Sequence, residues 1–399
     1  MLAALADRPR PVLAHHQGRT VVAADPVETV GPGDVWTALD EHPRGSESAD
    51  RVAGGLIGLL GYEMAADLEQ LPAGRGETGG APTVALGRYD TVAIEDERGR
   101  WSVHSVGAPH KARELEAIVE NAPAPAPAPV QLCGTPPEWS LPEAAHRRAV
   151  ERARELIRAG DCYQINLASK LSSRVEASPI ELAEALWTAA GPNRYSAFVG
   201  MPEGSVVSAS PERLLARSDG VAVTEPIKGT APLGAPAGEL LSEKNRAEHV
   251  MIVDLMRNDL GRVAEEGGVH VTQLMVRRPT SYVDHLVSEV RAKLRPGTRP
   301  SDLVRAVFPG GSVTGAPKVR AMEVIRELEP VDRGPAYGSV VVIGRDASMD
   351  MSVAIRTAWL SDGIASYWTG GAIVWDSDAR QEFAEAVLKA APFLGALGL

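Results

Sequence analysis

Lys228 is the side chain of this sequence best suited to covalent chemistry, and it lies among turn-forming neighbours in the segment PIKGT (residues 226–230). A free lysine amine has a pKa near ~10.4, so a nucleophilic lysine needs burial or a nearby cation that lowers its pKa toward neutrality. An isolated turn lysine is ordinarily a solvated charge. A covalent role for Lys228 therefore depends on the side chains around it. Glu212 is a candidate general acid only if it lies near Lys228.

The second candidate functional residue is a glutamate. Glu248 lies in EHVMIVDLMRNDLG, where the residues from Val250 to Val253 are apolar and predict a helix that is buried nearly all round. If Glu248 converges with Glu385 of the C-terminal segment, two carboxylates plus waters suit Mg²⁺, because this ion takes few protein ligands and can hold a substrate carboxylate. The sequence offers no histidine or cysteine pattern for a softer metal.

The C-terminal segment DARQEFAEAVLKAAPFL predicts a helix with two different sides. Its expected core stripe consists of Phe383, Ala384, Val387, Leu388 and Ala391. Glu382, Glu385 and Lys389 lie together on the other side. Taken alone, that side is a solvated face with an i,i+4 ion pair between Glu385 and Lys389.

Three further features suit an anionic ligand. The loop FPGGSVTGAPKVRAM from Phe308 lacks the Gly-Lys-Ser/Thr order of a nucleotide-binding loop, but its amides precede a helix start that favours a carboxylate. Arg356 is expected at the end of an apolar strand, where a guanidinium is costly to bury without an anion. His285 is expected on a strand, either as a core histidine or as a ligand or proton relay.

Composition limits the class of protein. The chain has 399 residues, 44% hydrophobic content and a net charge of −11, which indicate a globular protein and argue against a nucleic-acid partner. Cys133 and Cys162 are too few for a disulfide framework, so reduced thiols and a cytoplasmic location are expected. No signal-length or membrane-spanning apolar run is present, and we expect a soluble protein with no membrane partner.

The order of elements predicts an α+β fold with a large, mostly antiparallel sheet system. Residues 1–120 are expected to form a β-rich N-terminal subdomain. The Pro/Ala-rich stretch at 121–140 is expected to be a linker or surface loop. Residues 141–399 are expected to form the main domain, with a helix opened by Pro142 and closed by Gly160, and others at residues 238–260, 318–328 and 378–394.

Eight motifs in one order resemble the chorismate-utilising enzymes, most closely the large subunit of aminodeoxychorismate synthases. They are GDCYQINLA, SPERLL, TEPIKGT, EHVMIVDLMRNDLGRV, HLVS, GGSVTGAPKVRAMEVI, MDMSVAIRTA and GGAIVWDSDARQEFAE, between Gly160 and Glu385. The resemblance, which runs from about Arg51 to Leu394, implies two packed β-sheets ringed by helices, with the first 120 residues contributing strands to the same body.

The resemblance also implies roles for the candidate residues. Glu248 and Glu385 look like Mg²⁺ carboxylates, with Glu382 close by through water. Arg356 resembles the clamp on the enolpyruvyl carboxylate, and His285 is similar to the family's site histidine. The remaining substrate contacts are implied for Ser312, Thr314, Gly315, Ala372 and Lys389.

Lysine at position 228 determines which reaction the resemblance implies. The aminodeoxychorismate type is inferred to attack C2 of chorismate with this amine while Glu212 protonates the departing C4 hydroxyl, after which ammonia adds at C4 and expels the lysine. Anthranilate synthases carry alanine at this position. Isochorismate and salicylate synthases place a water-activating lysine where Gln164 stands. An anthranilate or aminodeoxyisochorismate synthase and a non-catalytic chorismate-binding subunit remain alternatives.

Three positions depart from the family pattern: Ala336 replaces an aromatic residue, while Val341 and Ala372 replace glycines. The chain also lacks the cysteine and histidine context of a glutamine amidotransferase. The resemblance therefore implies that a separate amidotransferase subunit delivers ammonia, in a folate or secondary-metabolite pathway.

Overall fold

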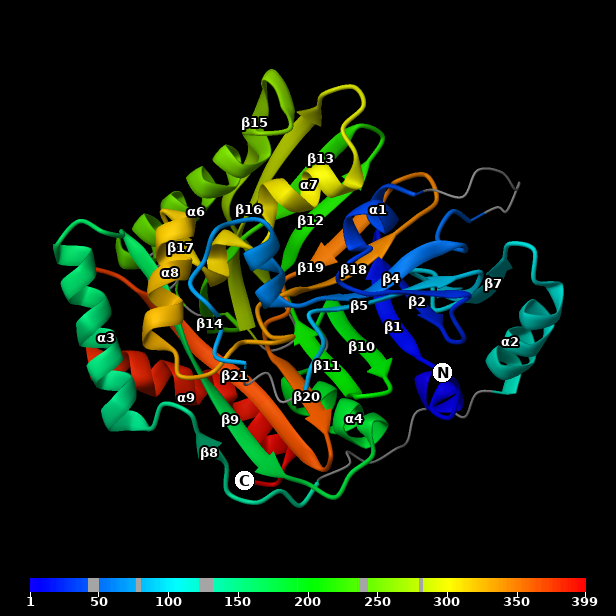
Figure 1. Cartoon of the computed structure of the whole chain (residues 1–399), viewed down its shortest axis with the longest axis horizontal. Helices are drawn as coiled ribbons and strands as arrows, with labels where there is room; N and C mark the ends of the chain where they lie inside the picture. Colours follow the sequence, from blue (N-terminus) through cyan, green and yellow to red (C-terminus); the bar gives the residue numbers. More distant parts are fainter. Residues whose placement is uncertain are drawn as a thin grey trace.

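The computed structural model describes residues 1–41, 50–76, 80–121, 132–191, 193–234, 236, 243–279 and 283–399. These residues form two large β-sheets, of eleven and ten strands, with helices around them (Figure 1). The strand pairings between named strands are antiparallel throughout the described part. The predicted α+β class is confirmed.

The eleven-stranded sheet, sheet A, contains β1 (Val12–His16), β2 (Arg19–Ala23), β6 (Thr91–Glu95), β7 (Trp101–Ser105), β8 (Glu138–Trp139), β9 (Gln164–Arg174), β10 (Tyr195–Met201), β11 (Gly204–Ser210), β17 (Gly315–Ala316), β20 (Thr357–Ser361) and β21 (Ile364–Ile373). Its order is β17-β9-β21-β20-β11-β10-β1-β2-β6-β7, with β8 beside β9.

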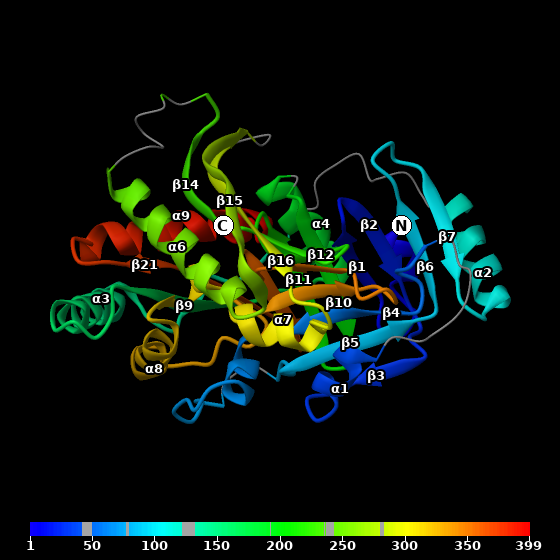
Figure 2. The ribbon, with the colours of Figure 1, turned by 90° about the horizontal axis from the view of Figure 1, so that it is seen from above.

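The ten-stranded sheet, sheet B, contains β3 (Glu28–Val30), β4 (Gly55–Leu60), β5 (Val84–Tyr89), β12 (Arg213–Ser218), β13 (Val221–Glu225), β14 (Ile227–Pro232), β15 (Ala264–Pro279), β16 (Val283–Leu294), β18 (Ser339–Ile343) and β19 (Met349–Ser352). Its order is β14-β16-β13-β12-β19-β18-β4-β5-β3, with β15 beside β16. Figure 2 shows β14, β15 and β16 beside helix α6 (Glu243–Gly261).

The other helices are α1 (Val35–Asp40), α2 (Pro109–Asn121), α3 (Glu143–Arg158), α4 (Pro179–Ala190), α7 (Pro300–Val307), α8 (Lys318–Leu328) and α9 (Ala379–Ala396), with short 3-10 turns η1 (Leu2–Leu5), η2 (Tyr62–Asp67) and η3 (Gly311–Val313). Local sequence explains several helix starts. Ser178 and Glu181 form a capping box at α4, and the Asp378 carboxylate accepts from the amides of Arg380 and Gln381 at α9.

Strands from the first 105 residues belong to both sheets. β1 pairs with β10 in sheet A, and β4 pairs with β18 in sheet B. The largest apolar core contains side chains of both sheets, for example Leu56 of β4 and Leu215 of β12 beside Ala168 of β9. Of the stretch 121–140 that we predicted to be a linker, residues 122–131 lie outside the described residues, and β8 pairs with β9 after them.

The predicted core stripe of the C-terminal helix is wrong. In α9, Leu388 is 72% exposed and Val387 is 37% exposed, whereas Glu382 is only 3% exposed. The helix instead packs on sheet A through small residues, Ala386 and Ala390, both fully buried. Of the acidic side that looked solvated in the sequence, Glu382 is therefore buried, whereas Glu385 and Lys389 stay exposed and form the predicted i,i+4 ion pair.

Two smaller expectations also need correction. Helix α6 is not buried nearly all round, because Val250 is 53% exposed while Ile252 is fully buried. Arg356 does not end a strand: it lies between β19 and β20, with φ of +51°.

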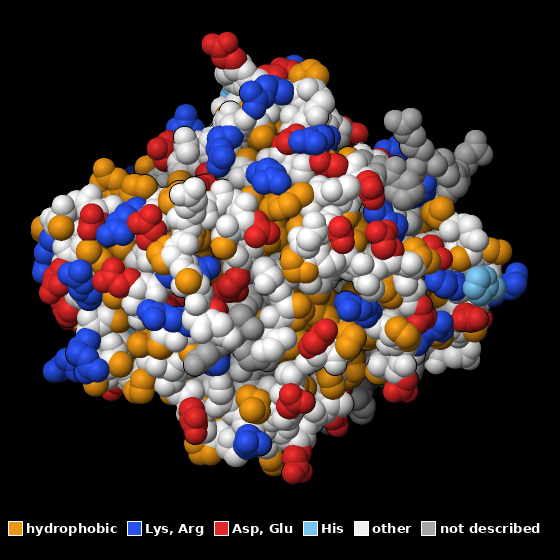
Figure 3. Space-filling model, viewed as in Figure 1, with side chains coloured by type: hydrophobic (Ala, Val, Ile, Leu, Met, Phe, Trp, Pro, Cys, Tyr) orange, Lys and Arg blue, Asp and Glu red, His pale blue; other side chains and the backbone are white. Residues whose placement is uncertain are grey.

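The face shown in Figure 3 carries acidic and basic side chains intermixed. Within the described residues, no helix is both long enough and apolar enough to span a bilayer.

Candidate active site

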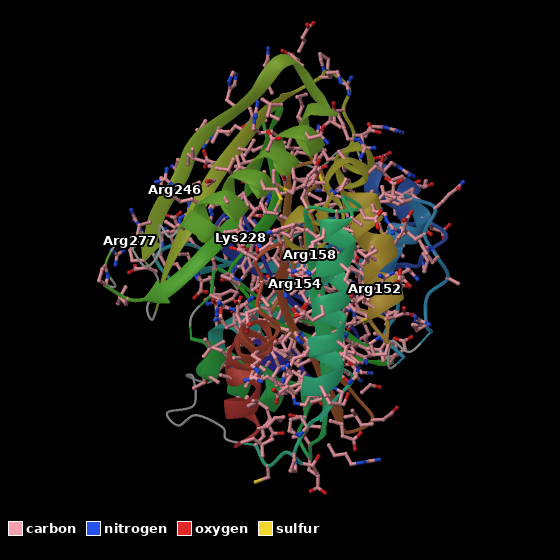
Figure 4. All side chains as sticks on the ribbon, turned by 90° about the vertical axis from the view of Figure 1, so that its left-hand side faces the viewer. Arg152, Arg154, Arg158, Lys228, Arg246 and Arg277 are labelled. Carbon is pink, nitrogen blue, oxygen red and sulfur yellow. The ribbon has the colours of Figure 1, made fainter. Side chains whose placement is uncertain are left out.

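Lys228 lies on β14 next to an irregularity in the pairing with β16. Lys228 is opposite Leu286 and Thr230 is opposite His285, so Gly229 is one extra residue that forms a β-bulge. Gly229 has φ of +76°, which glycine adopts at little steric cost. Bulges re-aim neighbouring side chains, and in Figure 4 Lys228 lies toward the middle of the molecule whereas Arg277 lies near its edge.

Four charged side chains act on the Lys228 amine. Burial lowers the pKa of Lys228, and the ammonium group of Lys389 lowers it further. The carboxylates of Glu248, Glu212 and Glu385 oppose this shift, because they favour the charged amine. We call these five residues the Lys228 cluster; they come from distant parts of the chain, and all five were sequence candidates.

Glu212 is the buried acid of the cluster. It lies between β11 and β12 and is 5% exposed. Burial raises the pKa of its carboxyl group to about 7, against the opposing effects of the Ser312 hydroxyl, the Lys228 amine and the backbone N–H of Ile227. Glu212 can therefore hold or release a proton near neutral pH, as a general acid must.

Arg356 and His285 stand beside Glu212 and β14. The guanidinium of Arg356 is half-buried, and burial lowers its pKa. No carboxylate forms an ion pair with it in the described part of the chain. Its left-handed backbone is uncommon for a residue with a side chain and is tolerated mainly where surrounding structure imposes it.

His285 is 3% exposed, and its pKa is lowered to about 4, first by burial and then by Arg356. Its imidazole also hydrogen-bonds with the backbone of Gly229 in the bulge. His285 is thus a neutral side chain at pH 7 that is hydrogen-bonded to the strand carrying Lys228 and near enough to Arg356 to feel its charge.

The loop 312–315 reaches the cluster through Ser312, which hydrogen-bonds with Glu212. The Thr314 hydroxyl donates to the Gly310 carbonyl at 3.0 Å, so this side chain is used within the loop. The Thr314 carbonyl accepts from the Asn166 amide of β9 at 2.8 Å. Because carbonyl and amide point in opposite directions across a trans peptide, the Gly315 N–H faces away from β9 and is available to an anion.

Glu382, Glu385 and Lys389 of α9 approach one another over Gly371 of β21. A Cβ atom at Gly371 would lie 3.3 Å from Glu382 Oε2, 3.7 Å from Glu385 Oε1 and 3.8 Å from Lys389 Nζ. Lys389 Nζ pairs with Glu385 Oε1 at 2.7 Å and donates to the Gly370 carbonyl at 2.9 Å. Glycine at 371 therefore leaves room for the charged groups of the helix.

These carboxylates have the donor chemistry that Mg²⁺ prefers. Glu248 and Glu385 both act on Lys228, and Glu382 and Glu385 meet over Gly371. Within the described residues, no three acidic, histidine or cysteine side chains are yet grouped closely enough to enclose a metal. An ion held by one or two carboxylates, waters and a substrate carboxylate fits this arrangement.

Ala372 is less closely tied to the cluster. It is half-buried on β21, opposite Asn166 of β9, and no described contact links it to Lys228. The valine at position 341 is accommodated because its cross-strand neighbour on β4 is Gly58.

Two residues absent from our site prediction lie in this region. His249 is fully buried between α6 and β16, with Nε2 2.7 Å from Ser288 Oγ, and its pKa is lowered to about 4 by burial and by Lys228. Its position directly after Glu248 is the signal that could have indicated it. Gln164 is fully buried, and its amide has no hydrogen-bond partner among the described residues.

Comparison with known proteins establishes the family. The model of the chorismate binding enzyme family matches residues 5–395. The chain belongs to this family. The resemblance inferred from the eight motifs is therefore confirmed.

Relatives with two different named activities have the same sequence identity to this chain. It is 38% identical to component 1 of anthranilate synthase from Streptomyces coelicolor, covering 93% of this chain and 79% of the relative. It is also 38% identical to component 1 of aminodeoxychorismate synthase from Klebsiella aerogenes, covering 95% and 86%. Overall identity does not separate the two activities.

The fold is that of a solved relative. The crystal structure of anthranilate synthase component I from Streptococcus pneumoniae superimposes with a TM-score of 0.79 at 30% identity, covering 96% of this chain and 90% of that chain.

Proposed function

We propose that this chain catalyses the amination of chorismate with ammonia to 4-amino-4-deoxychorismate, with Lys228 as a covalent nucleophile. The observation that carries the proposal is the pairing of Lys228, whose pKa is lowered, with Glu212, whose pKa is raised to about 7. Burial favours a neutral amine and a neutral carboxylic acid, and the two groups are near enough for the charge of each to act on the other. These are the protonation states that nucleophilic attack and leaving-group protonation need.

The two side chains divide the first step between them. The Lys228 nitrogen forms a bond to C2 of the ring, the two conjugated double bonds of the ring shift, and the C4–O bond breaks. Glu212 gives its proton to the departing hydroxyl, which leaves as water. Ammonia then forms a bond at C4, both double bonds shift back, and the C2–N bond breaks, so that Lys228 leaves as a neutral amine. The new C4 ammonium group gives one proton to the Glu212 carboxylate, which restores the acid.

Cationic groups and amides would hold the substrate. Arg356 is suited to the enolpyruvyl carboxylate, because its guanidinium is half-buried and has no carboxylate partner among the described residues. The Gly315 amide and Lys389 are suited to the ring carboxylate. Glu248, Glu385 and Glu382 would hold Mg²⁺, which when bound supplies positive charge for that carboxylate.

Ammonia would come from a separate glutamine amidotransferase subunit. The description of the relatives as component 1 supports a partner subunit. Free ammonium salts should replace that subunit in vitro, because the proposed second step uses ammonia itself.

The test is product analysis with purified protein, chorismate, MgCl₂ and an ammonium salt. Mass spectrometry should detect 4-amino-4-deoxychorismate with the wild-type protein, and Lys228→Ala should lose most of it. Turnover that is unchanged in Lys228→Ala would refute the covalent role.

The equal sequence identity to the anthranilate synthase component favours one alternative function, amination of chorismate at C2. The same assay tests this alternative. Amination at C2 would release pyruvate and form a fluorescent aromatic product. Its appearance in place of the C4 product would contradict our proposal. Binding of chorismate without any product would indicate a non-catalytic subunit.

A further inference from the structure

Arg333 is a fully buried cation outside the Lys228 cluster, and its guanidinium makes four hydrogen bonds. Its guanidinium is 1% exposed and binds Glu329 through two contacts, at 2.9 and 2.6 Å. The remaining donors reach two backbone carbonyls, those of Val313 and Asn166, at 2.7 Å each. Glu329 alone would neutralise the charge, so the contacts to the carbonyls need a separate explanation.

Both carbonyls belong to the loop 312–315 or to the strand that is hydrogen-bonded to it. Val313 lies within that loop. Asn166 lies on β9, and its amide donates to the Thr314 carbonyl at 2.8 Å. One planar guanidinium therefore fixes the loop and the strand on which the loop rests, and lysine, as a single point charge, cannot reproduce this fork.

Two aromatic rings enclose the Arg333 guanidinium. The rings of Tyr62 and Tyr337 each lie 4.5 Å from it. Tyr62 belongs to η2 in the N-terminal part of the chain, and its amide donates to the Gly334 carbonyl at 2.9 Å. Contacts therefore connect Tyr62, in the N-terminal part of the chain, to Arg333, and Arg333 to the loop 312–315 beside Glu212.

Charge pairing alone does not account for the arrangement. A buried ion pair contributes little net stability compared with apolar residues of the same size, because desolvation of the charges offsets their attraction. What an arginine fork supplies is geometry, since its donors fix several acceptors relative to one another. The acceptors here are the backbone of the anion-binding loop.

We propose that Arg333 is a positioning residue that holds the loop 312–315 in its ligand-binding shape, and that the ring of Tyr62 keeps the Arg333 guanidinium in place. The inference rests on the proposed role of this loop in binding a carboxylate of chorismate. It gives the N-terminal part of the chain an influence on substrate affinity, although Tyr62 touches no substrate.

The test measures chorismate affinity by calorimetry in the presence of Mg²⁺ and without ammonia. Arg333→Lys keeps the charge and loses the fork, and misplacing the loop should weaken affinity by about tenfold to a hundredfold. Tyr62→Leu removes one ring while leaving all four hydrogen bonds possible, so affinity should fall in the same direction. If Arg333→Lys does not fold, the affinity of Tyr62→Leu tests the proposal by itself.

Two controls separate positioning from general stability. Tyr62→Phe keeps the ring and removes only a hydroxyl without a hydrogen-bond partner in the described structure, so affinity should stay at the wild-type value. Leu115→Ala creates a cavity in the small core beside α2 and should lower the melting temperature without changing affinity.

The proposal is overturned if Tyr62→Leu and any folded Arg333→Lys behave like Leu115→Ala, with a lower melting temperature and unchanged affinity. Because the readout is affinity, absence of the aminated product would contradict the proposed function and leave this comparison intact.

Discussion

At the scale of single residues, burial gives the site its chemistry. The same desolvation that lowers the pKa of the Lys228 amine raises that of the Glu212 carboxyl group to about 7. Neither group needs a special partner for this effect. Exposed, the amine and the carboxyl group would both be charged at pH 7, so the proposed mechanism depends on the depth of the site.

The pH dependence of turnover should show the Glu212 titration. The acid must be protonated, and its pKa is raised to about 7, so kcat should fall as pH increases through about 7. Glu212→Gln cannot donate a proton and should lower kcat by about 10²- to 10⁴-fold, with loss of this alkaline limb.

The measurement is kcat between pH 5.5 and 9 at saturating chorismate, with thermal unfolding as a check that the variant is folded. An alkaline limb that persists in Glu212→Gln would show that another group is the acid.

At the scale of elements, two helices far apart in the chain each place a carboxylate where it acts on Lys228. Glu248 lies on α6, which packs on the side of sheet B, and Glu385 lies on α9, which packs on sheet A. Lys318 at the start of α8 forms a 2.7 Å ion pair with Asp259 of α6, so the segment after the loop 312–315 is fixed to the helix that carries Glu248. This ion pair thereby connects the helix that carries a proposed metal ligand to the loop that we propose binds a carboxylate.

Replacing these carboxylates should weaken magnesium binding. Glu248→Gln and Glu385→Gln each remove one anionic donor, and both should raise the Mg²⁺ concentration that gives half-maximal turnover. Calorimetric titration of Mg²⁺ into the protein with chorismate present gives a readout that does not depend on turnover. Chelation of Mg²⁺ should stop the wild-type reaction, and added Mg²⁺ should restore it.

Asp254→Asn is the matched control, because Asp254 lies on the same helix with a side chain that is 75% exposed. It should keep the wild-type magnesium response. A response of Glu248→Gln identical to that of Asp254→Asn would remove Glu248 from the proposed metal site.

At the scale of the whole molecule, the N-terminal strands complete both sheets. β1 and β2 extend sheet A beyond β10, and β4 and β5 extend sheet B beyond β18. The shared core contains fully buried side chains from both parts, such as Ile57 and Val341. Loss of the first part would expose this core and a long edge of each sheet.

A chain that begins at residue 132 should therefore not fold. Its expression should give aggregated protein, and any soluble fraction should lack a cooperative thermal transition by circular dichroism. Co-expression with residues 1–121 as a separate chain is the control, because it supplies the missing strands. A soluble, cooperatively unfolding fragment would show that residues 132–399 form an independent domain.

The sequence by itself determined the α+β class, the helix at 318–328 and the family, because these follow from local periodicity and from motifs in a fixed order. It also supplied all the members of the Lys228 cluster. It failed on α9, where the apolar residues Val387 and Leu388 are exposed and Glu382 is buried. Helical periodicity identifies two sides, but which side faces the protein depends on what lies opposite.

Only the tertiary structure decided that orientation. Gly371 of β21 leaves room for the charged ends of Glu382, Glu385 and Lys389, of which only Glu382 is buried, and small alanines pack the helix against the sheet. The role of Arg333 was equally beyond the sequence, since its acceptors are backbone carbonyls from segments that meet only in the folded chain. Local sequence specifies which groups are present, and long-range packing determines their burial, their pKa values and their partners.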